Sequence, residues 1–174
     1  MSGGEGLERL NQASSETAQA QLLDCCGSQK WARAMTEARP FANLTELLDE
    51  AARIWRGLDA ADWLEAFAAH PKIGARRTAP KQTAQSARWS HGEQSGASSA
   101  DGSVLDAMAE ANRLYERKFG YIFIVCATGK SAEEMLEICR RRLDNEPEAE
   151  LEIAAEEQRK ITEIRLKKLL AAEN

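Results

Sequence analysis

His70 is the side chain of this sequence best suited to move a proton near neutral pH. It stands in the stretch AAHPKIGARR, directly before Pro71. A proline disfavours the α conformation for the residue before it, so we expect a helix to end at about His70 and the imidazole to leave the helix axis. That position suits acid–base chemistry. The alternative is a helix-terminal histidine that only interacts with the helix dipole. Positive charges that can steer an anionic substrate follow at Lys72, Arg76 and Arg77.

Two more groups of polar residues are candidates for a binding site. Arg165 interrupts an apolar stripe that repeats at steps of four. Either its stem packs while its guanidinium reaches solvent, or the guanidinium lies at a pocket edge and meets a carboxylate or a ring carbonyl. Ser90, Glu93 and Gln94 form the other group, for which helix capping and loop polarity are the alternative explanation. His91 lies among them and is interpreted as a surface residue.

The sequence predicts no metal site. It contains two histidines and four cysteines, none of which forms a C-x-x-C pair. The cysteines are expected to be reduced thiols that pack as small apolar groups: Cys25, Cys26, Cys126 and Cys139.

Helices are the elements expected to position these residues. Asn43 with Glu46, and Ser131 with Glu134, have capping-box spacing. Pro147 suits the first turn of a long helix that runs to about residue 170. The pattern predicts an all-α fold, a compact single-domain bundle of about seven or more helices over residues 1–174.

Two segments do not follow the helical pattern. Residues 121–127, YIFIVCA, are apolar and β-branched, which favours a buried strand, yet no convincing partner strand exists. We therefore favour a helix or extended core backbone there. Residues 78–102 are rich in alanine, serine, glycine and glutamine, which predicts a linker or mobile loop, with a short helix able to begin at Ser90.

Composition excludes some classes of partner. The chain has 174 residues, of which 43% are hydrophobic and 29% charged, with a net charge of −5. That charge does not attract nucleic acid or an anionic membrane. No run of apolar residues reaches the ~20 needed to span a bilayer, and the first residues lack the apolar core of a secretory signal. We expect a cytoplasmic protein.

Four blocks of the sequence together resemble one family. They are HPKIG at 70–74, SHGEQ at 90–94, YERKFGYIFIVCATGKS at 115–131 and EEQRKITEIRL at 156–166. In this order they are similar to the 2-oxo-4-hydroxy-4-carboxy-5-ureidoimidazoline (OHCU) decarboxylases of urate breakdown. The resemblance implies an all-helical homodimer that needs no metal or organic cofactor and forms (S)-allantoin. It implies OHCU, a small molecule, as the substrate.

The resemblance also implies roles for individual residues. His70, Glu93 and Arg165 would be catalytic, and Pro71 would aim the histidine. The implied substrate contacts are Pro71, Ser90, Gln94, Arg165 and the segment of Ile124, Val125, Cys126, Ala127 and Thr128. Two positions depart from the family pattern. Lys118 stands where the family usually has arginine, and Thr128 stands where many of its members have arginine.

Other functions remain open on the sequence. A non-catalytic helical module could bind a partner through the exposed face of its last helix. Another small-ring enzyme, such as a hydantoin-type hydrolase or racemase, is the second alternative. A hydrolase would normally need a metal or an activated nucleophile, which the cysteines and histidines do not clearly supply.

Overall fold

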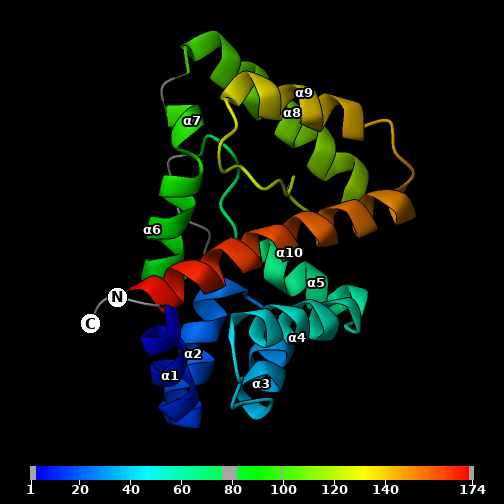
Figure 1. Ribbon diagram of the computed structural model, residues 1–174. Coiled ribbons are helices and arrows are strands. Elements are labelled where there is room, and N and C mark those ends of the chain that lie inside the picture. Colours follow the sequence, from blue (N-terminus) through cyan, green and yellow to red (C-terminus); the bar gives the residue numbers. More distant parts are fainter. Residues whose placement is uncertain (1–2, 76–81, 99, 173–174) are drawn as a thin grey trace. The chain divides into compact units, whose positions relative to one another are not determined.

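The computed structural model describes residues 3–75, 82–98 and 100–172, and all regular structure in these residues is helical (Figure 1). The prediction of an all-α fold is thus confirmed, with ten helices in the described part of the chain. They are α1 (Gly3–Gln12), α2 (Ser15–Cys25), α3 (Gln29–Glu37), α4 (Leu44–Arg56), α5 (Ala60–Ala68), α6 (Ala84–Glu93), α7 (Ser95–Ser98), α8 (Gly102–Phe119), α9 (Ala132–Arg142) and α10 (Pro147–Ala171). None of them is long and apolar enough to cross a membrane.

The helices form two compact units. The terminal unit comprises Met1–Ala66 and Arg159–Asn174, and the central unit comprises Phe67–Gln158. The boundary falls within α10, between Gln158 and Arg159. A single domain over the whole chain stays a prediction.

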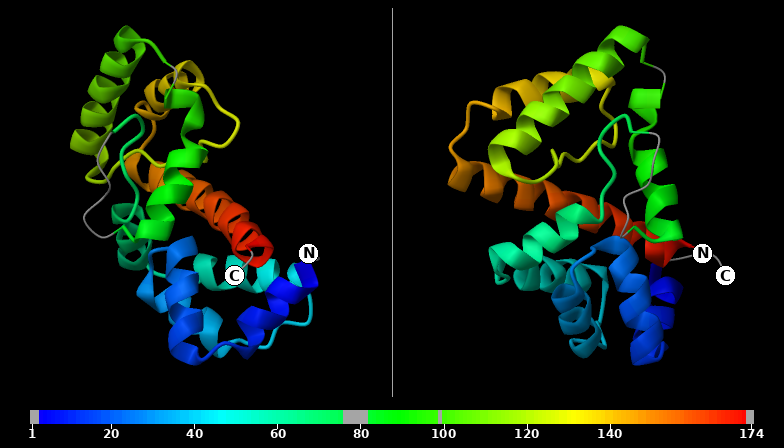
Figure 2. Two further views of the ribbon diagram at one scale, coloured as in Figure 1. Left: turned by 90° about the vertical axis from the view of Figure 1, so that its left-hand side faces the viewer. Right: turned by 180° about the vertical axis from the view of Figure 1, so that it is seen from behind.

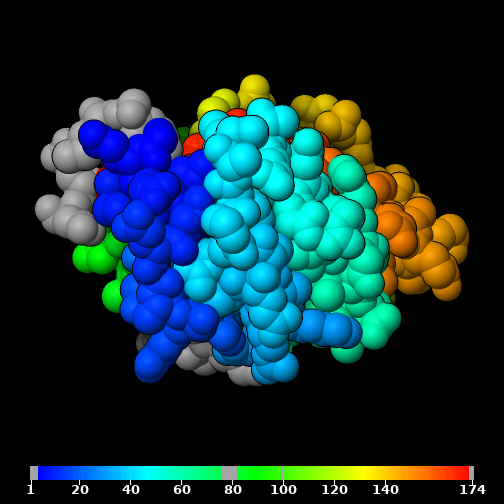
Figure 3. All heavy atoms as spheres, turned by 60° about the horizontal axis from the view of Figure 1, so that its bottom comes forward, coloured from blue at the N-terminus to red at the C-terminus, as the bar shows by residue number. Residues whose placement is uncertain are grey.

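Helix caps and two tryptophans organise the terminal unit. The Asn43 side chain accepts a hydrogen bond from the Glu46 amide and so begins α4, as its spacing predicts. Trp31 is completely buried, and its indole N–H donates to the Ala51 carbonyl over 3.1 Å. The Trp63 indole donates to the Trp55 carbonyl over 2.9 Å. Figure 3 shows that the side chains of the first helices cover one continuous face of this unit.

In the central unit, α8 and α9 lie side by side over an irregular apolar segment (Figures 1 and 2). Ser131 and Glu134 form the predicted capping box at the start of α9. Tyr115 of α8 packs against Phe123, with ring centroids 5.4 Å apart. Tyr115 and Phe123 belong to the buried core of the unit together with Met135 of α9.

Residues 121–127 form neither helix nor strand, so the helix that we considered for them is wrong; we call this non-helical stretch the extended segment. No other described segment pairs with them as a strand. Side chains bond to this backbone instead. Arg142 donates to the Ile124 carbonyl over 2.7 Å, and the Cys126 amide donates to Glu157 over 3.2 Å. Lys130 donates to the Cys126 carbonyl over 2.8 Å. These side chains supply hydrogen bonds that a neighbouring strand would otherwise provide, so the segment can be buried without belonging to a sheet.

A buried network of Arg142, Glu150 and Tyr115 fixes the guanidinium that bonds to this segment. Its guanidinium donates to the Glu150 carboxylate over 2.6 Å, and the Tyr115 hydroxyl donates to the same carboxylate oxygen over 2.5 Å. Asn145 donates to the other oxygen over 2.8 Å. Glu150 is completely buried. Burial, together with the hydrogen bond to Glu150, raises the pKa of Tyr115, so its hydroxyl stays protonated and donates.

The loop prediction for residues 78–102 is wrong for most of the described part, which contains α6 and α7. Thr83 caps α6 by accepting from the Ser86 amide over 3.0 Å, whereas Ser90 lies inside the helix and begins none. Composition misleads because small residues fill the buried positions here. Ser86 and Ser90 are each 4% exposed, and Ala97 is 3% exposed. A mobile loop there stays a prediction.

Candidate active site

His70 lies where its proline neighbour predicts. Helix α5 ends at Ala68, and the His70 amide still donates to the Phe67 carbonyl over 3.1 Å. The imidazole is half-buried. Its Nε2 lies 2.6 Å from Oε1 of Gln158, a completely buried residue of α10. The histidine is therefore held by a specific partner 88 positions along the chain, unlike a residue that only ends a helix.

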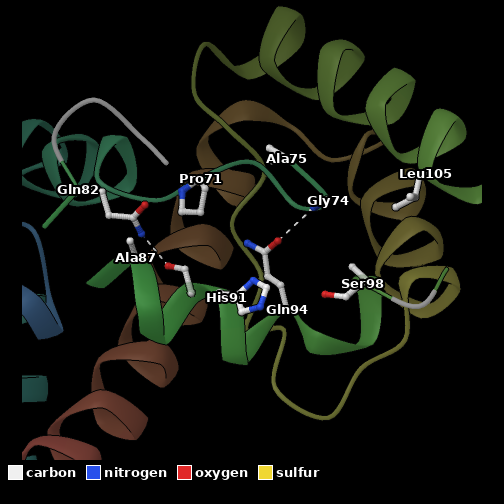
Figure 4. A pocket seen from close by; sticks show the side chains of 11 residues that line it. Pro71, Gly74, Ala75, Gln82, Ala87, His91, Gln94, Ser98 and Leu105 are labelled. Carbon is white, nitrogen blue, oxygen red and sulfur yellow. Dashed lines mark hydrogen bonds between the residues drawn. The ribbon is translucent and has the colours of Figure 1, made fainter. Parts of the chain in front are cut away.

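Helix α6 is tied to the turn that follows His70. The Gly74 amide donates to Oε1 of Gln94 over 3.1 Å, and Figure 4 shows this contact. Gly74 has a φ of 78°, a left-handed conformation that favours glycine. Just before this helix, the side-chain amide of Gln82 donates to the Ser90 hydroxyl over 2.8 Å. Two of the predicted contact residues, Ser90 and Gln94, are thus fixed by hydrogen bonds.

A cavity of about 410 Å³ opens between these elements (Figure 4). Its volume suits a small organic molecule. Pro71, Ser90 and Gln94 line it, as three of the sequence-predicted residues, and His91 lines it as well. The interpretation of His91 as a surface residue is therefore incomplete: it is exposed, but it faces the cavity.

Glu93 lies close to the extended segment around Cys126. Burial raises the pKa of the Cys126 thiol; Lys130 lowers it, and the negative charges of Glu157 and Glu93 raise it further. Glu93 is the last residue of α6, so the end of this helix brings a carboxylate towards that segment.

The extended segment presents a mixture of buried and exposed residues. Ile124, Val125, Cys126 and Ala127 are buried, and Thr128 is exposed. Both backbone polar groups of Cys126 already have partners in the chain. A ligand that bonds to the Cys126 amide must therefore displace Glu157 or share the amide with it.

Arg165 belongs to the terminal unit and is 2% exposed. Its guanidinium donates to the Asp24 carbonyl over 3.3 Å. The sequence left open whether the Arg165 guanidinium reaches solvent or lies at a pocket edge, and its burial shows that the first alternative is wrong.

Two further basic residues that the sequence analysis singles out, Lys72 and Lys118, have partners within the protein. Lys72 forms an exposed ion pair with Glu116, with 2.6 Å between Nζ and the carboxylate. Lys118 donates to the carbonyls of Leu143 and Asn145, over 2.6 Å and 2.9 Å, just after α9 ends. A lysine can replace an arginine there because point contacts to two carbonyls need no planar fork. Arg76 and Arg77 lie outside the described residues.

Gly96 in α7 allows a close approach between backbones. A Cβ atom at this position would collide with the carbonyl oxygen of Lys130. We expect Gly96→Ala to destabilise the protein by about 1–3 kcal/mol, because the colliding atoms are backbone and cannot rotate away. Gly92→Ala in α6 is the matched control, since it meets no atom within 4 Å and should be neutral or slightly stabilising. Thermal unfolding of both variants measures the effect, and equal stabilities would contradict the packing described.

Sequence reasoning missed three residues that bond to predicted site residues: Gln158 to His70, Glu157 to Cys126 and Gln82 to Ser90. Gln158 and Glu157 stand in the block EEQRKITEIRL, which carries part of the family resemblance. The sequence pattern that could have indicated Gln158 is its position three residues before Ile161, which places a polar residue on the buried stripe of a long helix. Across the described ranges, no three histidine, cysteine or acidic side chains are grouped so that they could hold a metal ion.

Comparisons with known proteins agree on one family. The OHCU decarboxylase family model matches residues 11–167. The uric acid degradation bifunctional protein TTL of Arabidopsis thaliana is 45% identical over 149 residues, and the match spans 84% of this chain but only 45% of that protein. The 2-oxo-4-hydroxy-4-carboxy-5-ureidoimidazoline decarboxylase of Amia calva is 35% identical, over 80% of this chain and 79% of that one. A crystal structure of OHCU decarboxylase in the presence of (S)-allantoin has a TM-score of 0.76 at 40% identity, covering 92% of this chain and 100% of that one.

Proposed function

Because this chain belongs to the OHCU decarboxylase family, we propose that it converts 2-oxo-4-hydroxy-4-carboxy-5-ureidoimidazoline into (S)-allantoin and carbon dioxide. The observation that carries the proposal is that the first three motif blocks, and Gln158 of the fourth, lie together in the central unit. His70 is fixed by Gln158, and its neighbour Pro71 lines the same cavity as Ser90 and Gln94. A helical module that only binds a partner gives no reason for such a cavity.

The substrate supplies its own acceptor for electrons. Its ring carbon C4 carries both a hydroxyl and a carboxylate, and the neighbouring carbon C5 is doubly bonded to nitrogen. When the bond to the carboxylate breaks, its electron pair forms a double bond between C4 and C5, and the imine pair moves to nitrogen, which takes a proton. Loss of the hydroxyl proton and protonation of C5 then give the product. The protein therefore has to orient the ring and place protons.

We assign His70 the role of general base or proton relay at the ring hydroxyl. An imidazole with a pKa of about 6.5 accepts and returns protons near neutral pH. Glu93 would bond to the hydroxyl or help to orient the imidazole. Protonation of C5 from one side would then give a single enantiomer.

The remaining predicted residues would hold the amide-rich ring. Ser90, Gln94 and the backbone of 124–128 can pair with its donors and acceptors, which cost about 1–3 kcal/mol each if buried without a partner. Arg165 would bind a ring carbonyl or the ureido group and stabilise developing negative charge. For Arg165 the support is its burial and its place in the last motif block.

The function is tested by the rate of substrate loss. The substrate is generated from urate with the two preceding enzymes, urate oxidase and hydroxyisourate hydrolase, and its ultraviolet absorbance is followed after this chain is added. We expect the decay to accelerate in proportion to the concentration of the chain. A decay rate equal to that of the spontaneous reaction would refute the proposal.

Arg165→Lys is expected to lower kcat/KM by at least about tenfold. Lysine keeps the positive charge but replaces a planar fork of donors with a single point, so bidentate recognition is lost. The same assay measures the effect, and the urea midpoint shows whether the variant is folded. Full activity in a folded Arg165→Lys variant would reduce this residue to a packing role.

Three further properties stay predictions. The family resemblance implies a homodimer and independence from cofactors, and the sequence itself predicts a cytoplasmic location. Size-exclusion chromatography with light scattering tests the first of them, with twice the chain mass of 19.2 kDa as the expected result.

A further inference from the structure

Gln158 has features that packing alone does not explain. It is a polar residue with no exposed surface, and its side-chain oxygen Oε1 lies 2.6 Å from Nε2 of His70. The contact joins α10 to the turn after α5 within the central unit. An amide oxygen can only accept a hydrogen bond, so the ring nitrogen that faces it carries a proton.

We propose that Gln158 is the positioning residue of the active site, which fixes the proton of neutral His70 on Nε2 and so makes Nδ1 the atom that accepts the substrate proton. The proposal rests on the proposed function. A neutral imidazole has one N–H and one basic nitrogen, and the partner of one decides the state of the other. Gln158 thereby selects both the tautomer and the direction in which the ring acts.

A neutral acceptor suits this task better than a carboxylate. A carboxylate at position 158 would stabilise the protonated imidazolium and raise the pKa of His70, so the base would be occupied by a proton near neutral pH. The neighbouring carboxylate, Glu157, instead accepts from the Cys126 amide. Consecutive residues of α10 thus serve two different parts of the site, the histidine and the extended segment.

Nitrogen-15 NMR of the imidazole rings tests the tautomer without any measurement of activity. The chain contains only His70 and His91, and a His91→Gln variant assigns the two sets of signals. In the wild-type chain above the pKa of His70, we expect nearly all of its neutral form to carry the proton on Nε2. In Gln158→Met, which keeps the length but removes the acceptor, the form protonated on Nδ1 should become populated. A wild-type ring protonated mainly on Nδ1, or an unchanged ratio in Gln158→Met, would overturn the proposal.

Kinetics separate positioning from a merely structural role. We expect Gln158→Met to lower kcat by at least about tenfold, part of the 10²–10⁴ that general acid–base catalysis contributes, with a smaller change in KM. Gln158→Glu should move the acidic limb of the kcat/KM profile upward by about one pH unit or more, because the base must lose a proton that the new carboxylate holds. Gln85→Glu makes the same change on α6, where the Gln85 side chain accepts a hydrogen bond from Arg88, and it should leave the limb in place.

The outcomes of these experiments are distinguishable. An inactive wild-type chain whose His70 has the expected tautomer would refute the proposed reaction and leave only the tautomer that Gln158 selects. An active chain in which Gln158→Glu leaves the pH profile unmoved would refute the role of Gln158 and retain the reaction. Gln158→Glu is nearly isosteric, so it stays informative if Gln158→Met does not fold.

Discussion

We expect His70→Asn to lower turnover at least about 100-fold while the protein stays folded. The loss follows from removing the acid–base group, whose contribution is typically 10²–10⁴. The imidazole is half-buried, so the substitution opens no large cavity in the core. His70→Ala should show a similar loss. The assay is formation of optically active allantoin from substrate generated in situ.

Two controls accompany the His70 variants. Far-ultraviolet circular dichroism and the thermal midpoint should resemble those of the wild-type chain. Because Asn lacks a group that titrates near neutrality, the residual activity should also lose the acidic limb of the pH profile. Nearly wild-type turnover in a folded His70→Asn variant would remove the histidine from the mechanism.

Arg142→Met should be the most destabilising of the substitutions discussed, with a loss of about 3–5 kcal/mol in the free energy of unfolding. The reason is that Glu150 would remain completely buried without its positive partner. The Ile124 carbonyl would lose its donor as well, so the segment that is proposed to contact the substrate should loosen. Urea unfolding followed by circular dichroism measures the change.

The neighbouring arginine provides the matched control. Arg141→Met removes the same charge from the same helix, but Arg141 is exposed, so the change should stay below about 1 kcal/mol. Replacing Arg142 and Glu150 together by Met should cost less than Arg142→Met alone, because no unpaired charge is left. Equal destabilisation by Arg142→Met and Arg141→Met would contradict the buried network.

Helix ends were predictable where one local interaction decides them. Asn43, the Ser131–Glu134 box and Pro147 act on their own turn, so their spacing in the sequence is sufficient. Helix α6 was not predictable from apolar periodicity, because small residues such as Ser90 make its buried contacts. The hydrogen bond from Gln82 that satisfies the Ser90 hydroxyl appears only in three dimensions.

The residues of the candidate active site were predictable only in part. Proline indicated that His70 leaves its helix, and the motif blocks selected it over an idle helix end. Gln158 was within a quoted block, yet its role depends on a contact across 88 positions. Local spacing cannot reveal such a contact, because the chain folds back through α8 and α9 before it reaches α10.

The handedness of the allantoin formed tests the central claim most directly. Spontaneous decay of the substrate gives both enantiomers, whereas proton delivery from one side of a bound ring gives one. Urate is converted in situ in the presence of this chain, and circular dichroism of the product is recorded. We predict the signal of (S)-allantoin, present with the wild-type chain and absent with His70→Asn. A racemic product from the folded wild-type chain would contradict the account.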